Sequence, residues 1–88
     1  MSLAARIEQR LAALAPRSVE LTDESGLHVG HEGAKSGSHF RLTIVSDRFA
    51  GMPRVQRHRV VYDALGPLMS TEIHALALRA LTPDELDD

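Results

Sequence analysis

Residues 40–45 read Phe-Arg-Leu-Thr-Ile-Val, the stretch of this 88-residue chain that most clearly predicts a β-strand. Phe40, Leu42 and Ile44 take every second position, the period that places side chains on one face of a sheet. Residues 19–23 alternate in the same way, so we expect the two stretches to pair as an antiparallel hairpin. Residues 26–37, between them, contain four glycines, two histidines and one lysine, a composition typical of a long connection.

Helical patterns lie on both sides of this hairpin. Residues 3–14 carry leucine or isoleucine at spacings of four, four and three behind Ser2, which predicts an amphipathic helix with a serine N-cap. Pro16 blocks its continuation. Residues 53–65 begin with a proline suited to a first helical turn and carry an apolar stripe, which predicts a second helix that Gly66-Pro67 ends or kinks.

The last third of the chain completes the fold. Residues 73–80 are short and aliphatic, which favours a buried third strand. Thr82-Pro83-Asp84-Glu85 has the form of a capping box and predicts a brief acidic final turn. The order α-β-β-α-β-α makes the connection into the third strand a right-handed parallel crossover. We therefore predict an α+β fold with a three-stranded mixed sheet covered on one face by helices.

The composition limits what the chain can do. Its hydrophobic content of 43% is enough for one small core, so we expect a single domain spanning residues 1–88. The lack of cysteine excludes disulfides, a thiol nucleophile and Cys-based metal sites within the chain. No apolar run is long enough to cross a bilayer and the N-terminus lacks a signal-peptide core, so we expect a cytoplasmic protein without a membrane partner.

Motifs of the common enzyme classes are missing from the sequence. There is no Walker loop, no His-Glu-x-x-His pattern and no credible Ser-His-Asp set. A hydrolytic metal site built from His28 and His31 is the weakest alternative, because nothing in the spacing singles out a third ligand. We therefore expect a protein that is not an enzyme.

Five short stretches, in this order and at these separations, resemble the BolA family, and the resemblance covers nearly the whole chain. They are Ser38-His39-Phe40, Val45-Ser46-Asp47-Arg48-Phe49, Arg57-His58-Arg59, Ile73-His74-Ala75-Leu76 and Thr82-Pro83-Asp84-Glu85. The resemblance implies a BolA-like domain with the type II KH-like topology, in agreement with the element order predicted above.

Histidine is the chain's only side chain that both binds a borderline metal and titrates near neutrality. His74 begins the third strand, where alternation predicts one row with Leu76 and Leu78, opposite Ile73 and Ala75. From the residues alone, a histidine hydrogen-bonded to backbone is the simpler interpretation. The resemblance implies instead that His74 is a ligand of an iron-sulfur cluster.

The same resemblance implies a second ligand in the loop between the first two strands. The chain resembles the histidine-bearing branch of the family. We favour His28 as this ligand because of its distance from the stretch Asp23-Glu24-Ser25, and His31 is a close competitor. The implied function is an adaptor in iron-sulfur trafficking or iron and redox regulation, which binds a monothiol glutaredoxin and shares a [2Fe-2S] cluster with glutaredoxin and glutathione. Isolated, the chain would hold no cofactor, and a homodimer is an open alternative. His39 and His58 are predicted to be structural.

A cluster of arginines supports a different function. Arg48, Arg54, Arg57 and Arg59 lie within twelve positions of a chain whose net charge is −2. They form either a solvated helix face, a docking surface or a nucleic-acid footprint that would neutralise a few phosphates. Because the BolA family includes members described as DNA-binding transcriptional regulators, the third interpretation is our alternative function.

Overall fold

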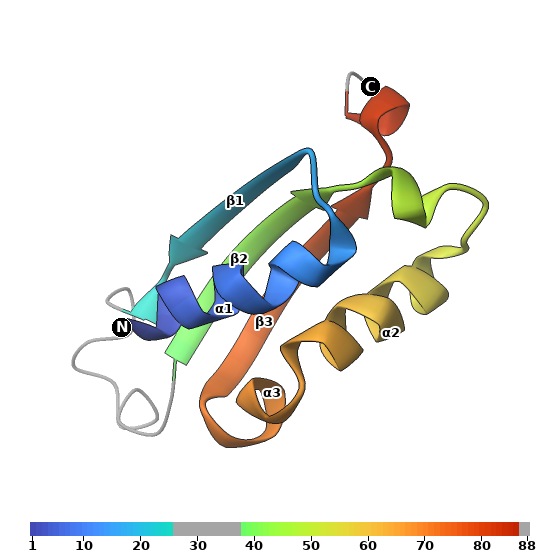
Figure 1. The fold of residues 1–88 in the computed structure, drawn as a ribbon. Coiled ribbons are helices and arrows are strands. Elements are labelled where there is room, and N and C mark those ends of the chain that lie inside the picture. Colours follow the sequence, from blue (N-terminus) through green and yellow to red (C-terminus); the bar gives the residue numbers. More distant parts are fainter. Residues whose placement is uncertain (26–37, 87–88) are drawn as a thin grey trace.

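The computed structural model describes residues 1–25 and 38–86 (Figure 1). In chain order the helices and strands are α1 (Leu3–Leu11), β1 (Ser18–Asp23), β2 (Ser38–Val45), α2 (Arg54–Leu65), α3 (Pro67–Thr71) and β3 (Ile73–Leu81). The short 3-10 turns η1 (Ala12–Leu14), η4 (Asp47–Phe49) and η5 (Pro83–Glu85) follow α1, β2 and β3.

The predicted sheet is confirmed. Its strand order is β1-β2-β3, with β1 antiparallel and β3 parallel to the central strand β2. Figure 1 shows α1 and α2 on the same face of this sheet. Within residues 1–25 and 38–86 no helix covers the other face, which we call the open face. The fold is therefore α+β, with a three-stranded mixed sheet and helices on one side.

The first helix begins where the sequence predicts, because the Ser2 hydroxyl accepts a hydrogen bond from the Ala5 amide at 3.1 Å. Its last turn tightens into η1, and the chain leaves through Ala15 at a positive φ of 47° before Pro16. The predicted helix over residues 3–14 is thus an α-helix followed by a 3-10 turn, a common way to satisfy terminal carbonyls.

The second helical segment is divided in two. Pro53 is the N-cap of α2 rather than its first helical residue, and Gly66 ends the helix. Pro67 then starts the short helix α3, which buries Leu68. The break at Gly66-Pro67 is confirmed, and α3 is an element that the sequence analysis did not predict separately.

The hydrophobic core lies between the helices and one face of the sheet. Its buried apolar side chains come from α1, η1, β2, η4, α2, α3 and both ends of β3. The most completely buried large side chains are Ile7, Leu11, Leu42, Ile44, Phe49, Val61 and Leu65.

Candidate functional site

His74 lies at the start of β3, and its side chain is exposed. In the pairing with β2, Ser38 is opposite Ile73 but the next residue, His39, is opposite Ala75. One residue of β3, His74, is therefore extra, as in a β-bulge. Bulges of this kind often redirect a side chain near a functional site.

This irregularity makes the predicted alternation of β3 wrong. Leu76 is opposite Phe40 in the register and packs against the core, yet Ile73 is also buried in the core. Ile73 and Leu76 therefore share the helix-covered face, and His74 does not share a row with Leu76 and Leu78. The extra residue shifts the alternation by one position, which a strict period of two cannot predict.

His74 instead meets a second histidine on the open face of the sheet. His39 precedes the buried Phe40 on β2, so it points away from the core. The ring centroids of His39 and His74 are 5.1 Å apart, and the ring planes are inclined by 38°. The structure thus brings together two histidines that are 35 positions apart in the sequence (74 minus 39). No pattern along the sequence reveals this pair, because only the strand register brings the two residues together.

The backbone of His39 ties this end of the sheet to the residues after β1. Its amide donates a hydrogen bond to the Ser25 hydroxyl at 3.0 Å, and its carbonyl accepts one from the Glu24 amide at 2.8 Å. These two backbone hydrogen bonds anchor the start of β2. Since Ser38 is also opposite Ile73, the residues on both sides of segment 26–37 lie at the His74 end of the sheet.

His28 and His31, the two candidates for the second ligand, lie outside the described residues. Within residues 1–25 and 38–86, no group of three or more histidine, cysteine, aspartate or glutamate side chains could hold a metal ion. The described part of the chain thus offers an exposed imidazole for a metal centre, but no complete coordination sphere. This donor set fits a cluster whose other ligands come from elsewhere, and it does not fit a self-contained one.

His58, predicted to be structural, lies on α2. Its ring centroid is 6.3 Å from that of Tyr62 one helical turn later, with the planes inclined by 55°. His58 also lines a small pocket beside Arg54 and Arg79. It is separated from the His39–His74 pair by its position on the other face of the sheet.

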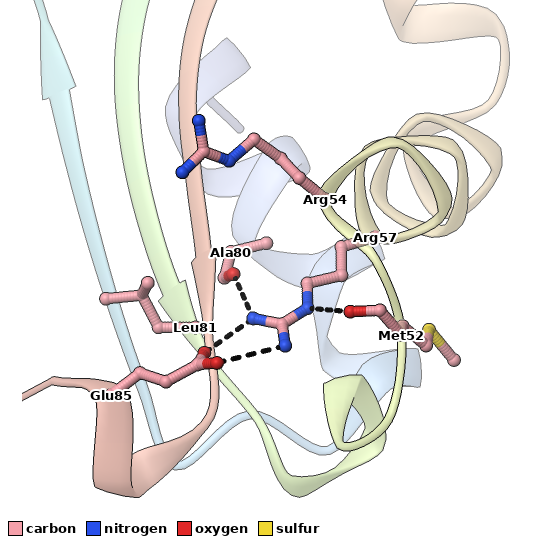
Figure 2. A pocket seen from close by; sticks show the side chains of 6 residues that line it. All are labelled: Met52, Arg54, Arg57, Ala80, Leu81 and Glu85. Atoms are coloured by element: carbon pink, nitrogen blue, oxygen red, sulfur yellow. Dashed lines mark hydrogen bonds and ion pairs between the residues drawn. The ribbon is translucent and has the colours of Figure 1, made fainter.

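The four arginines of the alternative function have different surroundings. Arg48, Arg54 and Arg59 are exposed. The side chain of Arg57 is only 12% exposed, because it packs between α2, the end of β3 and η5 (Figure 2). Arg57 is therefore not part of a freely accessible basic face with the other three.

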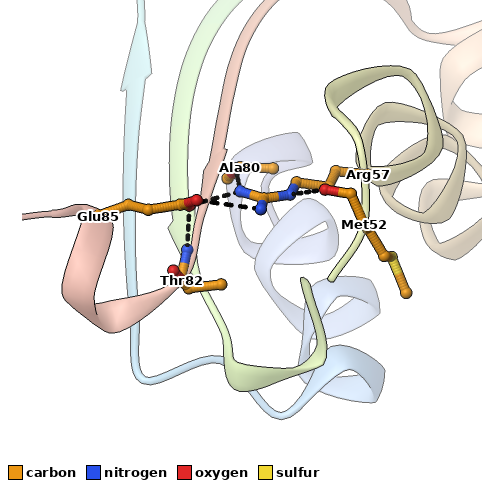
Figure 3. A network of polar contacts seen from close by, with 5 residues as sticks. All are labelled: Met52, Arg57, Ala80, Thr82 and Glu85. Carbon is orange, nitrogen blue, oxygen red and sulfur yellow. Dashed lines mark hydrogen bonds and ion pairs between the residues drawn. The ribbon is translucent and has the colours of Figure 1, made fainter. Parts of the chain in front are cut away.

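Arg57 is bound by three separate partners (Figure 3). Its Nε donates to the Met52 carbonyl at 2.8 Å and its Nη1 to the Ala80 carbonyl at 3.0 Å. Nη1 and Nη2 also donate to the two carboxylate oxygens of Glu85, at 2.5 and 3.1 Å. This bidentate pair is the strongest arginine–carboxylate geometry, and it fastens the C-terminal turn to α2.

The same contacts determine the charge of Glu85. The hydrogen bonds from the Arg57 side chain, with one from the Thr82 amide, lower the pKa of the Glu85 carboxyl to about 2. The hydrogen bond from the Thr82 backbone amide to the Glu85 carboxylate is 2.8 Å long, and it is one half of the predicted capping box. Glu85 is therefore ionised at neutral pH, and it neutralises Arg57.

A shallow pocket of about 360 Å³ lies over this network, between α2 and the end of β3. Arg54 stands at its edge in Figure 2. Arg54 also borders the neighbouring pocket together with Arg79 of β3, a cation that the sequence analysis did not include. The parallel pairing of β3 brings Arg79 to this place, so the arginine cluster in the sequence could not reveal it.

Comparison with known proteins decides the family. The family model for the BolA-like protein matches residues 11–85. The chain belongs to the BolA-like family. It is 44% identical over 82 residues to BolA-like protein 1 of Mus musculus, covering 93% of this chain and 56% of that protein. It is also 44% identical over 86 residues to the DNA-binding transcriptional regulator BolA of Escherichia coli, covering 97% and 80%.

A solved structure supports the same assignment. BolA1 from Arabidopsis thaliana aligns with a TM-score of 0.82 and 38% identity, over 97% of this chain and 96% of that one. The BolA-like fold predicted from the short motifs is therefore confirmed. Within the described residues, no helix of this BolA-like chain is long and apolar enough to span a membrane.

Proposed function

We propose that this BolA-like chain is a non-enzymatic adaptor that binds a monothiol glutaredoxin in the cytoplasm and co-ligates a [2Fe-2S] cluster. His74 would supply one nitrogen ligand, and His28 or His31 the second. Glutaredoxin and glutathione would supply the sulfur ligands that a chain without cysteine lacks. The adaptor would act in iron-sulfur trafficking or in iron and redox regulation.

The exposed position of His74 is the observation that carries the proposal. His74 is exposed next to the irregular pairing with β2, on the open face of the sheet. A partner protein can approach it there without displacing any helix in the described part of the chain. Ser25 and Ser38, the described residues on either side of segment 26–37, lie at this same end of the sheet. His28 and His31 follow Ser25 by three and six positions in the sequence, so we consider both as the second ligand.

The histidine donor atoms would change the charge and the reduction potential of the cluster. When histidine nitrogen replaces thiolate, the cluster carries less negative charge and its reduction potential generally rises. Membership in the BolA-like family, which includes a protein named as a transcriptional regulator, supports a role as an adaptor or regulator.

The test is reconstitution with a glutaredoxin that already carries its cluster. The wild-type chain should elute together with the loaded glutaredoxin and change its visible absorbance and circular dichroism. His74→Ala should remove that change, and the single variants His28→Ala and His31→Ala should identify the loop ligand. His58→Ala is the matched control on the opposite face and should behave as wild type. A wild-type chain that elutes separately and leaves the visible spectrum unchanged would refute the proposal.

A second candidate function is DNA binding. It is favoured by the description of the Escherichia coli relative as a DNA-binding transcriptional regulator and by the exposure of Arg48, Arg54 and Arg59. Arg57 contributes little to this surface because Glu85 neutralises it. The basic surface would contact phosphates and confer affinity more than sequence specificity.

Charge removal tests this second function. The double variant Arg54→Gln/Arg59→Gln should weaken binding to duplex DNA and reduce the slope of log affinity against log salt by up to about 2, roughly 0.9 for each lost phosphate contact. Arg10→Gln, an exposed arginine near the opposite end of α2, is the control. Equal salt slopes for the double variant and the wild type would argue against DNA binding through this surface.

A further inference from the structure

The ring contact between His39 and His74 has consequences for the orientation of the candidate ligand. His74 is exposed and lies on the sheet edge formed by β3, and in strands a side chain has two common χ1 rotamers. The centroid separation of 5.1 Å falls in the range of favourable contact between aromatic rings. The His39 ring therefore restricts the directions in which the His74 imidazole can point.

His39 is well held for such a role. Both of its backbone polar groups are hydrogen-bonded, the amide to Ser25 and the carbonyl to Glu24. Its side chain is half-buried, whereas that of His74 is exposed, and the next residue, Phe40, is fixed in the core. The more constrained ring of the pair therefore belongs to His39, and the His74 ring adapts to it.

We propose that His39 is a positioning residue, whose ring packs against His74 and holds the His74 imidazole in the direction in which it binds the shared cluster. The inference rests on the function proposed above. Residues that orient a metal-bound histidine typically change metal affinity by 10- to 100-fold when they are mutated, although they do not touch the metal. Here the orienting contact is ring packing across two parallel strands.

Two variants at one position separate packing from ligation. His39→Phe keeps an aromatic ring beside His74 but has no nitrogen, and His39→Ala removes the ring. Thr43→Ala is the control, because Thr43 lies on the same strand and the same open face, four residues away. If His39 acts by packing, the phenylalanine variant should behave as wild type and the alanine variant should not.

The first measurement needs no cluster. Three-bond NMR couplings of the His74 side chain in the isolated protein report whether χ1 adopts one rotamer or averages among several. The wild-type chain, His39→Phe and Thr43→Ala should show a single rotamer, and His39→Ala should show averaging. Couplings in His39→Ala that equal those of the wild-type chain would overturn the proposed positioning.

The second measurement uses the cluster-loaded glutaredoxin. His39→Ala should bind about tenfold more weakly and alter the visible circular dichroism, and His39→Phe should restore both. His39→Phe could instead bind the loaded glutaredoxin as weakly as His39→Ala while its couplings still show a single His74 rotamer. In that case the His39 nitrogen itself is needed, and the positioning role is refuted. If the wild-type chain gives no cluster signal at all, the proposed function fails, while the couplings still decide whether His39 orients His74.

Discussion

At the scale of single residues, the contact between Arg57 and Glu85 shows that the folded structure, and not the sequence neighbourhood, determines what a charged side chain binds. The sequence presents Arg57 among basic neighbours and Glu85 as the third residue of a capping box. In the folded chain they form a bidentate ion pair, 28 residues apart, and Arg57 also satisfies the Ala80 carbonyl at the sheet edge. An arginine held in this way fastens the C-terminal turn and is a poor contact for phosphate.

The low pKa of Glu85 leads to a prediction about acid stability. The folded-state pKa of about 2 lies below the ordinary value of 4.5, so ionised Glu85 favours the folded state above pH 4.5. That contribution should be lost as the pH falls from about 4.5 to about 2. Glu85→Gln retains an oxygen for the Thr82 amide but cannot titrate. The difference in unfolding free energy between wild type and Glu85→Gln, measured by denaturant titration, should therefore shrink across this pH range. A constant difference would contradict the prediction.

At the scale of elements, the link between α2 and α3 depends on one glycine. Gly66 has φ +57° and ψ −132°, a conformation that residues with a Cβ rarely adopt. This backbone geometry lets Pro67 start a new helix in another direction and bring Leu68 into the core. The dipeptide Gly66-Pro67 predicted a break, and the backbone geometry explains why a short helix follows.

Gly66→Ala should lower the unfolding free energy by about 1–3 kcal/mol because of backbone strain. A Cβ at this position would also lie 3.1 Å from Arg10 Nη1, the end of a flexible side chain. The comparison of Gly66→Ala with Arg10→Ala/Gly66→Ala in thermal or denaturant unfolding separates the two causes. If backbone strain is the cause, adding Gly66→Ala to Arg10→Ala should lower the unfolding free energy by as much as Gly66→Ala lowers it in the wild-type chain. A smaller loss in the Arg10→Ala background would mean that the contact with the Arg10 side chain, and not the backbone, is responsible.

At the scale of the whole molecule, stability centres on the strand between the two sheet edges. β2 is paired on both sides, while β1 and β3 each have one paired edge. Leu42 and Ile44 of β2 are fully buried, whereas β1 has only half-buried or exposed residues. The central strand β2 is therefore the most buried part of the sheet. The candidate ligand His74 lies next to it, at the start of the edge strand β3.

This arrangement predicts the order of amide hydrogen exchange. The amides of Leu42 and Ile44 should exchange most slowly, because they open only when the core opens. The amides of β1 and of the first residues of β3 should exchange faster, since among the described residues no strand pairs with the outer edge of either. Native-state exchange followed by NMR measures these rates directly. Protection in β1 equal to that in β2 would contradict the predicted order.

Part of the candidate site could be predicted from the sequence and part could not. The Ile73-His74-Ala75-Leu76 motif pointed to His74, and the alternation over residues 40–45 predicted the strand beside it. Neither pattern could reveal that His39 meets His74, because this contact depends on a one-residue irregularity between parallel strands. Likewise, the arginine cluster could not show that Arg57 is paired with a carboxylate. Its partner Glu85 lies 28 residues later, in the turn that follows β3.

The sequence by itself determined the three sheet strands, the two longer helices with the serine cap of α1, and the capping box after β3, because these follow from local periodicity and from side chains that bind nearby backbone. The tertiary structure decided which face His74 occupies, which ring lies against it and which arginine loses its free charge. These features depend on strand register and on contacts between distant residues, and a pattern read along the chain contains neither.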